Sequence, residues 1–396
     1  MKPFVFVTGM FRSGTTLLAR MLNAHPQIAF ASDPYARVFK AFRNAVAVKT
    51  FGEDQVDHAA PLDDYYFYPR KQTLMRQIQQ TTLDLSTDNI DVEALQQQVK
   101  QASAPFSPAI APHLNRLQGK TFTELFANGL NIIDTTYGND TTQMLGFKEV
   151  WTGEFVPHLL ETFPQAKVLL VVRDPRAVCA SKNVLEEKYP WLFLMRQWRK
   201  LSTLAWIYQQ PTFAHHDRVL VFRFEELIQD PETWIKTFCD FMNIEFHENL
   251  KDPTTFVDGG GKPWQQNSSH FEGKQTFNTK SISKWERTLT EQQIQFIETG
   301  CFAEMKLLGY ERKTRESLPL SLLFEPPEIA EQDLANWIRP YAPTSIEALI
   351  QETALERIRL ETIQHQHDLP STQKRAFCLD EAFYDAAHHH CQQEVQ

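Results

Sequence analysis

The first part of the chain contains five short apolar runs, which are separated by segments with helical periodicity. The runs lie at residues 4–7, 28–31, 143–148, 167–173 and 219–224. Short apolar runs that alternate with helical segments predict strands joined by helices. The run from Val168 to Val172 has no polar residue, which is typical of a strand buried on both faces of a parallel sheet. The pattern therefore predicts an α/β fold built on a doubly wound parallel sheet.

Side chains capable of binding or chemistry stand at or just past the ends of these predicted strands. They are Arg12, Asp33, Lys148, Arg173 and Phe224. Ligands of doubly wound proteins bind at the carboxyl ends of the strands. We therefore expect a functional site at this edge of the sheet.

The first predicted strand leads into a glycine loop, residues 9–16 with the sequence GMFRSGTT, and then into a helix. Such a loop directs backbone N–H groups and the positive end of a helix dipole at one place, which suits a phosphate or sulfate group. The loop of nucleoside triphosphatases reads G-x-x-x-x-G-K-[ST]. Here Thr15 stands at the lysine position, and the nearest cation is Arg12. The loop therefore predicts an anion site that does not bind ATP with magnesium.

A second strand-to-helix junction follows the run at 167–173. Asp174 and Pro175 are typical of the N-cap and the first residue of a helix. We expect this helix to begin at once and to carry Ser181 two turns from its start.

The rest of the chain is predicted to be mainly helical. Residues 1–312 are expected to form one domain, with residues 35–145 as a helical insertion over the site. Further helices are expected at 154–163, 232–241 and 291–308. Prolines then punctuate a helical C-terminal extension, 313–396, with helices near 328–338 and 344–366. We interpret the histidine run at 388–390 as part of a solvated tail.

The overall charge limits the possible partners. The chain has a formal net charge of −9, which argues against nucleic acid as a partner. The five cysteines are scattered, which fits a reducing compartment without a disulfide framework. No run approaches 18 apolar residues, and the first strand starts close to Met1. We therefore expect a cytoplasmic protein without a membrane segment.

The loop GMFRSGTT and the run VVRDPRAVCAS at 171–181 together resemble the sulfotransferases that use 3′-phosphoadenosine 5′-phosphosulfate (PAPS). RFEELIQDPE at 223–232 and SKW at 283–285 support the resemblance, which covers about residues 4–312. Within the family, the chain looks closest to the tyrosylprotein and carbohydrate branches. The resemblance implies a P-loop-like sulfotransferase fold, PAPS as donor, 3′,5′-bisphosphoadenosine as product and no metal.

The resemblance also implies roles for individual residues. Arg12 would contact the 5′-phosphosulfate, and Lys148 would aid departure of the bisphosphate. Asp33 looks like the counterpart of a glutamate that removes the proton of the acceptor, although it is one methylene shorter and its neighbours differ. The remaining residues expected to bind the cofactor are Ser13, Gly14, Thr15 and Thr16 in the loop, Arg173 and Ser181 at the 3′-phosphate, and Phe224, Ser269 and Lys284.

The resemblance and the residues that carry it imply transfer of a sulfuryl group from PAPS to a hydroxyl of a small molecule, glycan or peptide by in-line displacement. Two alternatives stay open at this point. A nucleotide-dependent kinase would use Asp174 for magnesium, but the loop lacks the lysine. A catalytically silent nucleotide-binding protein would not need Arg12, Asp33 and Lys148. The sequence names neither the acceptor nor the oligomeric state.

Overall fold

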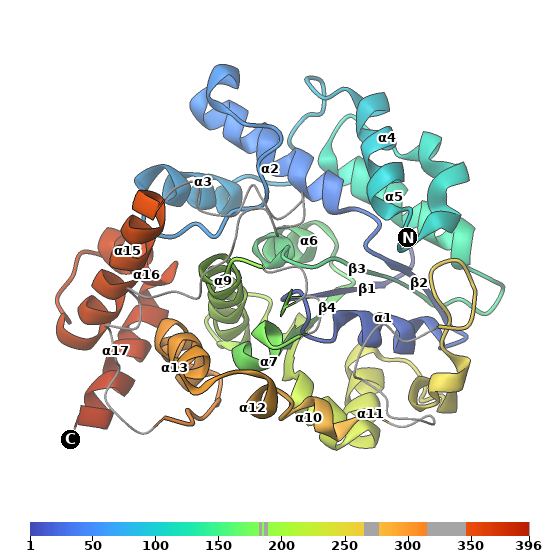
Figure 1. The fold of residues 1–396 in the computed structure, drawn as a ribbon. Coiled ribbons are helices and arrows are strands. Elements are labelled where there is room, and N and C mark those ends of the chain that lie inside the picture. Colours follow the sequence, from blue (N-terminus) through green and yellow to red (C-terminus); the bar gives the residue numbers. More distant parts are fainter. Residues whose placement is uncertain (182–183, 186–188, 265–276, 315–345, 396) are drawn as a thin grey trace. The chain divides into compact units, whose positions relative to one another are not determined.

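The computed structural model describes residues 1–181, 184–185, 189–264, 277–314 and 346–395 (Figure 1). The chain divides into two compact units. The first comprises Met1–His58, Arg76–Val172 and Tyr208–Thr279, and the second comprises Ala59–Met75, Arg173–Ile207 and Lys280–Gln396. The expected division near residue 312 stays a prediction, and the two units are described separately below.

A five-stranded parallel sheet forms the centre of the first unit (Figure 1). Its strands are β1 (Phe4–Gly9), β2 (Ile28–Ser32), β3 (Met144–Lys148), β4 (Ala166–Val172) and β5 (Val219–Arg223), in the spatial order β2-β3-β1-β4-β5. All four neighbouring pairs are parallel. The five strands predicted from the apolar runs and the α/β fold class are confirmed.

The register brings the ends of three strands together. Lys148, the last residue of β3, pairs with Val7 of β1 on one side and with Ser32 of β2 on the other. Every residue of these three strands is buried, because the sheet is covered on both faces. The residues that follow β1, β2 and β3 therefore emerge at one edge of the first unit.

Helices cover both faces of this sheet, as expected for a doubly wound fold. Figure 1 shows α1 on one face of the sheet and α5 and α6 on the other. The α-helices of the first unit are α1 (Thr15–Asn23), α2 (Ala36–Phe51), α4 (Val92–Ser103), α5 (Phe122–Tyr137), α6 (Val156–Thr162), α10 (Phe224–Gln229) and α11 (Pro231–Met242). Its 3-10 helices are η1 (Glu53–Gln55), η2 (Pro108–Arg116), η3 (Gly153–Phe155), η4 (His216–Arg218), η5 (Glu248–Lys251) and η6 (Pro253–Thr255). The predicted helical content of residues 35–145 is confirmed, although α2 and α5 were not predicted individually.

The second unit is helical. Its elements are α7 (Pro175–Cys179), α12 (Trp285–Thr288), α13 (Glu291–Gly300), α14 (Phe302–Leu307), α15 (Ile346–His365), α16 (Ser371–Cys378) and α17 (Glu381–Val395). Helices α3 (Pro69–Gln80) and α9 (Trp191–Gln209) and the 3-10 helix η7 (Thr279–Ser281) each contribute residues to both units.

Two predicted helices of this unit need correction. Helix α7 ends at Cys179, so Ser181 follows the helix and does not lie within it. The predicted helix at 291–308 is two helices, because it is interrupted at Cys301, which caps both.

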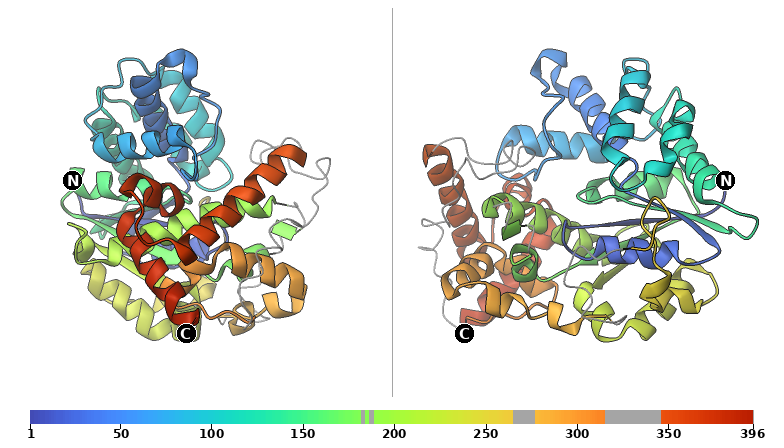
Figure 2. Two further views of the ribbon diagram at one scale, coloured as in Figure 1. Left: turned by 90° about the vertical axis from the view of Figure 1, so that its left-hand side faces the viewer. Right: turned by 45° about the vertical axis from the view of Figure 1, so that its right-hand side comes forward.

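The C-terminal helices α15, α16 and α17 pack against one another (Figure 2). The predicted helix at 344–366 is confirmed as α15, whereas the stretch 328–338 lies outside the described residues. The solvated tail was a wrong interpretation. His388 is buried, and its Nδ1 lies 2.6 Å from the carbonyl oxygen of Ile363, so this part of α17 packs against α15.

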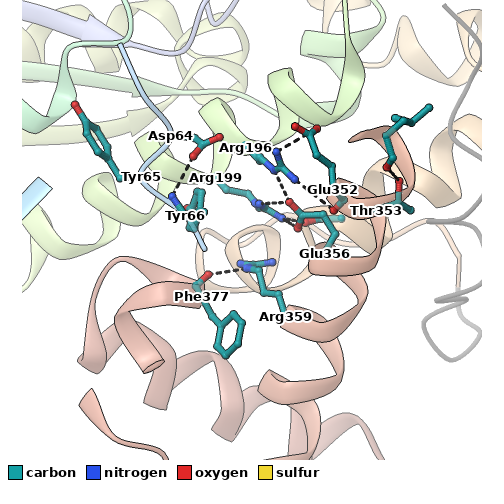
Figure 3. A network of polar contacts seen from close by, with 12 residues as sticks. Asp64, Tyr65, Tyr66, Arg196, Arg199, Glu352, Thr353, Glu356, Arg359 and Phe377 are labelled. Carbon is teal, nitrogen blue, oxygen red and sulfur yellow. Dashed lines mark hydrogen bonds and ion pairs between the residues drawn. The ribbon is translucent and has the colours of Figure 1, made fainter. Parts of the chain in front are cut away.

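Buried ion pairs connect three helices of the second unit, and Figure 3 shows those between α9 and α15. We call Arg196, Arg199, Glu304, Glu356 and Arg359 the arginine network. Nε of Arg196 and Nη2 of Arg199, both on α9, lie 2.7 and 2.8 Å from Oε1 of Glu356 on α15. Arg359 on α15 pairs with Glu304 on α14. Because all five side chains are buried, the network ties α15 to α9 and α14.

Candidate active site

The glycine loop after β1 has the features of an anion site. Gly14 is the N-cap of α1 with a φ of 91°, a conformation that favours glycine. No side chain of the described residues caps this helix, so its first N–H groups are directed at the loop. Ser13 is fully buried, and its Oγ has no hydrogen-bond partner among the described residues. A buried hydroxyl without a partner beside helix N–H groups fits a bound phosphate or sulfate oxygen.

The other predicted loop residues lie around this turn. Thr15 is buried and Thr16 is exposed at the start of α1. The guanidinium carbon of Arg12 lies 5.5 Å from the centre of the Phe11 ring. Phe224 is fully buried, and a Cβ at Gly14 would come within 2.3 Å of its ring. Phe224 thus packs against the loop, and its role at the adenine stays a prediction.

Three residues with left-handed backbone follow the three neighbouring strands β1, β2 and β3. Their φ angles are 67° at Arg12, 48° at Asp33 and 64° at Trp151. Residues other than glycine adopt this conformation at an energetic cost, and such residues cluster at functional sites. The strain at these strand ends supports a functional site in the first unit.

Asp33 and Lys148, two of the predicted catalytic residues, form an ion pair at these strand ends. The backbone N–H of Asp33 also donates to the carbonyl oxygen of Lys148 over 2.7 Å. The Lys148 side chain is 3% exposed and that of Asp33 is 14% exposed. The pair is therefore held rigidly while the carboxylate keeps partial access to solvent.

Glu149, which the sequence analysis did not single out, lies behind this pair. Its Oε1 accepts from the backbone N–H of Tyr35 just before α2. Burial raises the pKa of Glu149 well above its ordinary value, and the neighbouring carboxylate of Asp33 raises it further. Its position immediately after a buried strand was the signal that could have identified it.

Ser107 fixes the end of β2 from a distant part of the sequence. Its Oγ accepts from the backbone N–H of Ser32 and donates to the carbonyl oxygen of the same residue, each over 2.8 Å. Ser32 is the residue before Asp33, so Ser107 helps to hold the strained turn. No sequence signal connects residues this far apart.

In the second unit, Arg173 is the first residue after β4 in the chain. It is 6% exposed, and its Nη2 donates to the carbonyl oxygen of Ser281 over 3.1 Å. The carbonyl oxygen of Arg173 accepts from Nε1 of Trp198 over 2.7 Å. Asp174 caps α7 as predicted, since its carboxylate accepts from the backbone N–H of Arg176. The Oγ of Ser181 is buried without a hydrogen-bond partner in the described part of the chain, which also fits a phosphate oxygen.

Arg176 organises this turn and was not predicted. Its guanidinium pairs with Asp174 and Glu298, each at 2.6 Å, and lies 3.9 Å from the centre of the Trp285 ring. Lys284, the partly exposed residue before Trp285, is the N-cap of α12. Predicted residue Ser269 lies outside the described residues.

The described residues contain no group of three or more His, Cys, Asp or Glu side chains that could hold a metal ion. They also contain no helix with the length and apolar character needed to span a bilayer.

Comparison with known proteins identifies the family. A model of the sulfotransferase family matches residues 3–248. Protein-tyrosine sulfotransferase of Drosophila melanogaster is 21% identical over 293 residues, which cover 72% of this chain and 47% of the fly protein. Carbohydrate sulfotransferase 2 of Homo sapiens is 22% identical over 367 residues, which cover 78% of this chain and 66% of that protein. The chain thus spans about half to two thirds of the length of these relatives.

Among solved structures, the sulfotransferase domain of the Synechococcus PCC 7002 olefin synthase matches with a TM-score of 0.45 and 18% identity, over 78% of this chain and 95% of that domain. The family assignment rests on the sequence match, which covers more than half of the chain. The resemblance to the tyrosylprotein and carbohydrate branches is confirmed by the relatives named above. The chain belongs to the sulfotransferase family.

Proposed function

We propose that the protein transfers a sulfuryl group from PAPS to a hydroxyl acceptor by in-line displacement. Family membership supports sulfuryl transfer, and the finer proposal rests mainly on one observation. A carboxylate and an ammonium, Asp33 and Lys148, are paired at the strand ends of the unit that also carries the glycine loop. A reaction that removes a proton from a hydroxyl and expels an anionic group needs both a base and a cation.

The residues present fit PAPS as donor. The N-terminus of α1 and the buried hydroxyl of Ser13 suit the 5′-phosphosulfate. The motif resemblance assigns Arg173 and Ser181 to the 3′-phosphate, and the buried hydroxyl of Ser181 suits that role. When bound, PAPS supplies the sulfuryl group and leaves as 3′,5′-bisphosphoadenosine.

Each protein side chain has a distinct role in this proposal. Asp33 accepts the proton of the acceptor hydroxyl as the new oxygen–sulfur bond forms. Lys148 stabilises the negative charge that develops on the leaving phosphate as the old oxygen–sulfur bond breaks. Arg12 orients the group being transferred from its place in the loop. Since these cations neutralise the charge directly, the transfer requires no added metal.

The acceptor is a hydroxyl compound. The relatives are named as protein-tyrosine and carbohydrate sulfotransferases, so phenolic side chains and sugars are the first classes to test. The experiment is transfer of labelled sulfate from PAPS to a panel of phenols, sugars and aliphatic alcohols, with a chelator present. We expect transfer to at least one acceptor in the presence of the chelator. Turnover of ATP with magnesium but no transfer from PAPS would reject the proposal and favour a kinase.

A further inference from the structure

Phe106 is an exposed aromatic side chain beside the ion pair of the candidate active site. It is 44% exposed, and Met1 is the only other large apolar residue of the described first unit with comparable exposure. The Lys148 ammonium lies 5.9 Å from the centre of its ring. A single exposed apolar residue is common on protein surfaces, so what points to a role for Phe106 is the position of its ring beside the predicted catalytic groups.

The backbone around Phe106 is fixed from the strand side. Ser107, the next residue, is fully buried and makes both hydrogen bonds to the backbone of Ser32 at the end of β2. Ser107 follows Phe106 in the chain, and Asp33 follows Ser32. The two hydrogen bonds between Ser107 and Ser32 therefore hold the backbone of Phe106 close to that of Asp33, the predicted base.

A glycine-rich hairpin also contacts this backbone. Val257 and Pro263 form an isolated bridge, and Gly259 lies between them. A Cβ at Gly259 would come within 1.7 Å of the carbonyl oxygen of Phe106, so the two backbones are in direct contact. The hydroxyl of Tyr137 donates to the carbonyl oxygen of Gly259 over 3.2 Å. The ring of Phe106 therefore stands on a rigid support while much of its surface faces solvent.

We propose that Phe106 is a specificity-determining residue that contacts the acceptor, and that the acceptor carries a flat apolar group next to its hydroxyl, as a phenol does. This inference rests on the proposed function, in which the acceptor hydroxyl approaches Asp33. A hydroxyl that reaches Asp33 brings its substituent close to the Phe106 ring, because that ring lies against the ammonium paired with Asp33. Covering the exposed part of the ring would favour an apolar face over a hydrated one.

The experiment compares wild type with Phe106→Ala and Phe106→Leu, using para-cresol and glycerol as acceptors and PAPS as donor. We expect Phe106→Ala to raise KM for para-cresol about tenfold, because it removes apolar contact area. Phe106→Leu, which keeps part of that area, should show a smaller increase. The KM for PAPS should stay within about twofold in both variants, since the ring is not assigned to the donor.

Ile350→Ala is the matched control, because it truncates an exposed apolar side chain on α15 in the second unit. It should leave KM for para-cresol unchanged. Saturation-transfer NMR of para-cresol with the protein and 3′,5′-bisphosphoadenosine gives a second measurement that needs no turnover. The ring signals of para-cresol should weaken in Phe106→Ala.

The outcomes separate the two proposals. If wild type transfers sulfate to para-cresol and Phe106→Ala has the same KM and the same NMR signals, the role of Phe106 is rejected while the proposed function stands. The role of Phe106 is also rejected if wild type transfers sulfate to glycerol but neither transfers sulfate to para-cresol nor binds it. If wild type transfers nothing from PAPS to any acceptor, the proposed function fails and this inference fails with it.

Discussion

The Asp33–Lys148 pair of the first unit and the arginine network of the second unit combine the same kinds of charge in different surroundings. Glu356 is 1% exposed and contacts two guanidinium groups. Asp33 is 14% exposed, contacts one ammonium and sits in a strained turn. The Glu356 carboxylate is buried in ion pairs with guanidinium groups, whereas the Asp33 carboxylate keeps partial access to solvent.

The pKa values of two buried carboxylates shift in opposite directions. One is Glu356 in the arginine network, and the other is Glu149 behind the Asp33–Lys148 pair. Burial acts to raise the pKa of Glu356, but Arg199 and Arg196 outweigh it and lower the pKa to about 2. Burial raises the pKa of Glu149, and the nearby carboxylate of Asp33 adds to the effect. The network therefore holds the Glu356 carboxylate in its ionised form, which suits a structural role. The strand-end site instead places Glu149 close to Asp33, which disfavours ionisation of Glu149, and such perturbed carboxylates are typical of functional sites.

The largest expected effect is the loss of stability when the arginine network is broken. Glu356→Ala leaves two buried guanidinium groups without their carboxylate, so the free energy of unfolding should fall by about 3–5 kcal/mol. Urea denaturation measures this. Glu361→Ala is the control, because Glu361 lies on the same helix with a 46% exposed side chain and should cost much less. Equal losses in the two variants would contradict a structural role for the network.

The second effect concerns chemistry and not stability. Asp33→Asn keeps the shape of the side chain but removes the carboxylate proposed as the base, so turnover should fall about 10²–10⁴-fold. Affinity for 3′,5′-bisphosphoadenosine, measured by calorimetry, should stay the same. Asp88→Asn, at an exposed aspartate of the first unit, provides the control. Retained turnover in Asp33→Asn would place the base elsewhere.

The third effect is on cofactor affinity. Arg173→Ala should weaken binding of 3′,5′-bisphosphoadenosine about 10–100-fold, because the proposed function assigns its guanidinium to charge-assisted hydrogen bonds with the 3′-phosphate. Calorimetric titration of the variant with 3′,5′-bisphosphoadenosine measures this affinity. The control is Arg357→Ala, titrated in the same way, because Arg357 is a partly exposed arginine of α15. An unchanged affinity would remove Arg173 from the cofactor site.

The smallest effect concerns Glu149 and its pH dependence. Because folding raises the pKa of Glu149, its contribution to stability is fully present below its ordinary pKa near 4.5 and is lost as the pH rises through the folded value. Glutamine mimics the protonated form, so Glu149→Gln should unfold at the same or slightly higher urea concentration than wild type at pH 8. A variant clearly less stable than wild type at that pH would show that the ionised form is needed.

The sequence predicted the strands well because each is a buried apolar run, a local signal. It also placed Asp33 and Lys148 at strand ends that a parallel sheet brings together, although their ion pair was not predicted. Contacts without a local pattern were missed. Ser107 reaches Ser32 across 75 residues, and Arg359 reaches Glu304 across 55. The early end of α7 was missed too, because residues 177–180 give no local stop signal.

The most direct test compares sulfate transfer from labelled PAPS by wild type and by Lys148→Met at equal concentrations of folded protein. Methionine keeps much of the apolar stem of the lysine and removes the charge that pairs with Asp33. The account predicts transfer by wild type and a loss of at least about 100-fold in the variant, because one preorganised charge at a developing anion contributes this much. Equal transfer by both proteins would contradict a catalytic role for the strand-end ion pair.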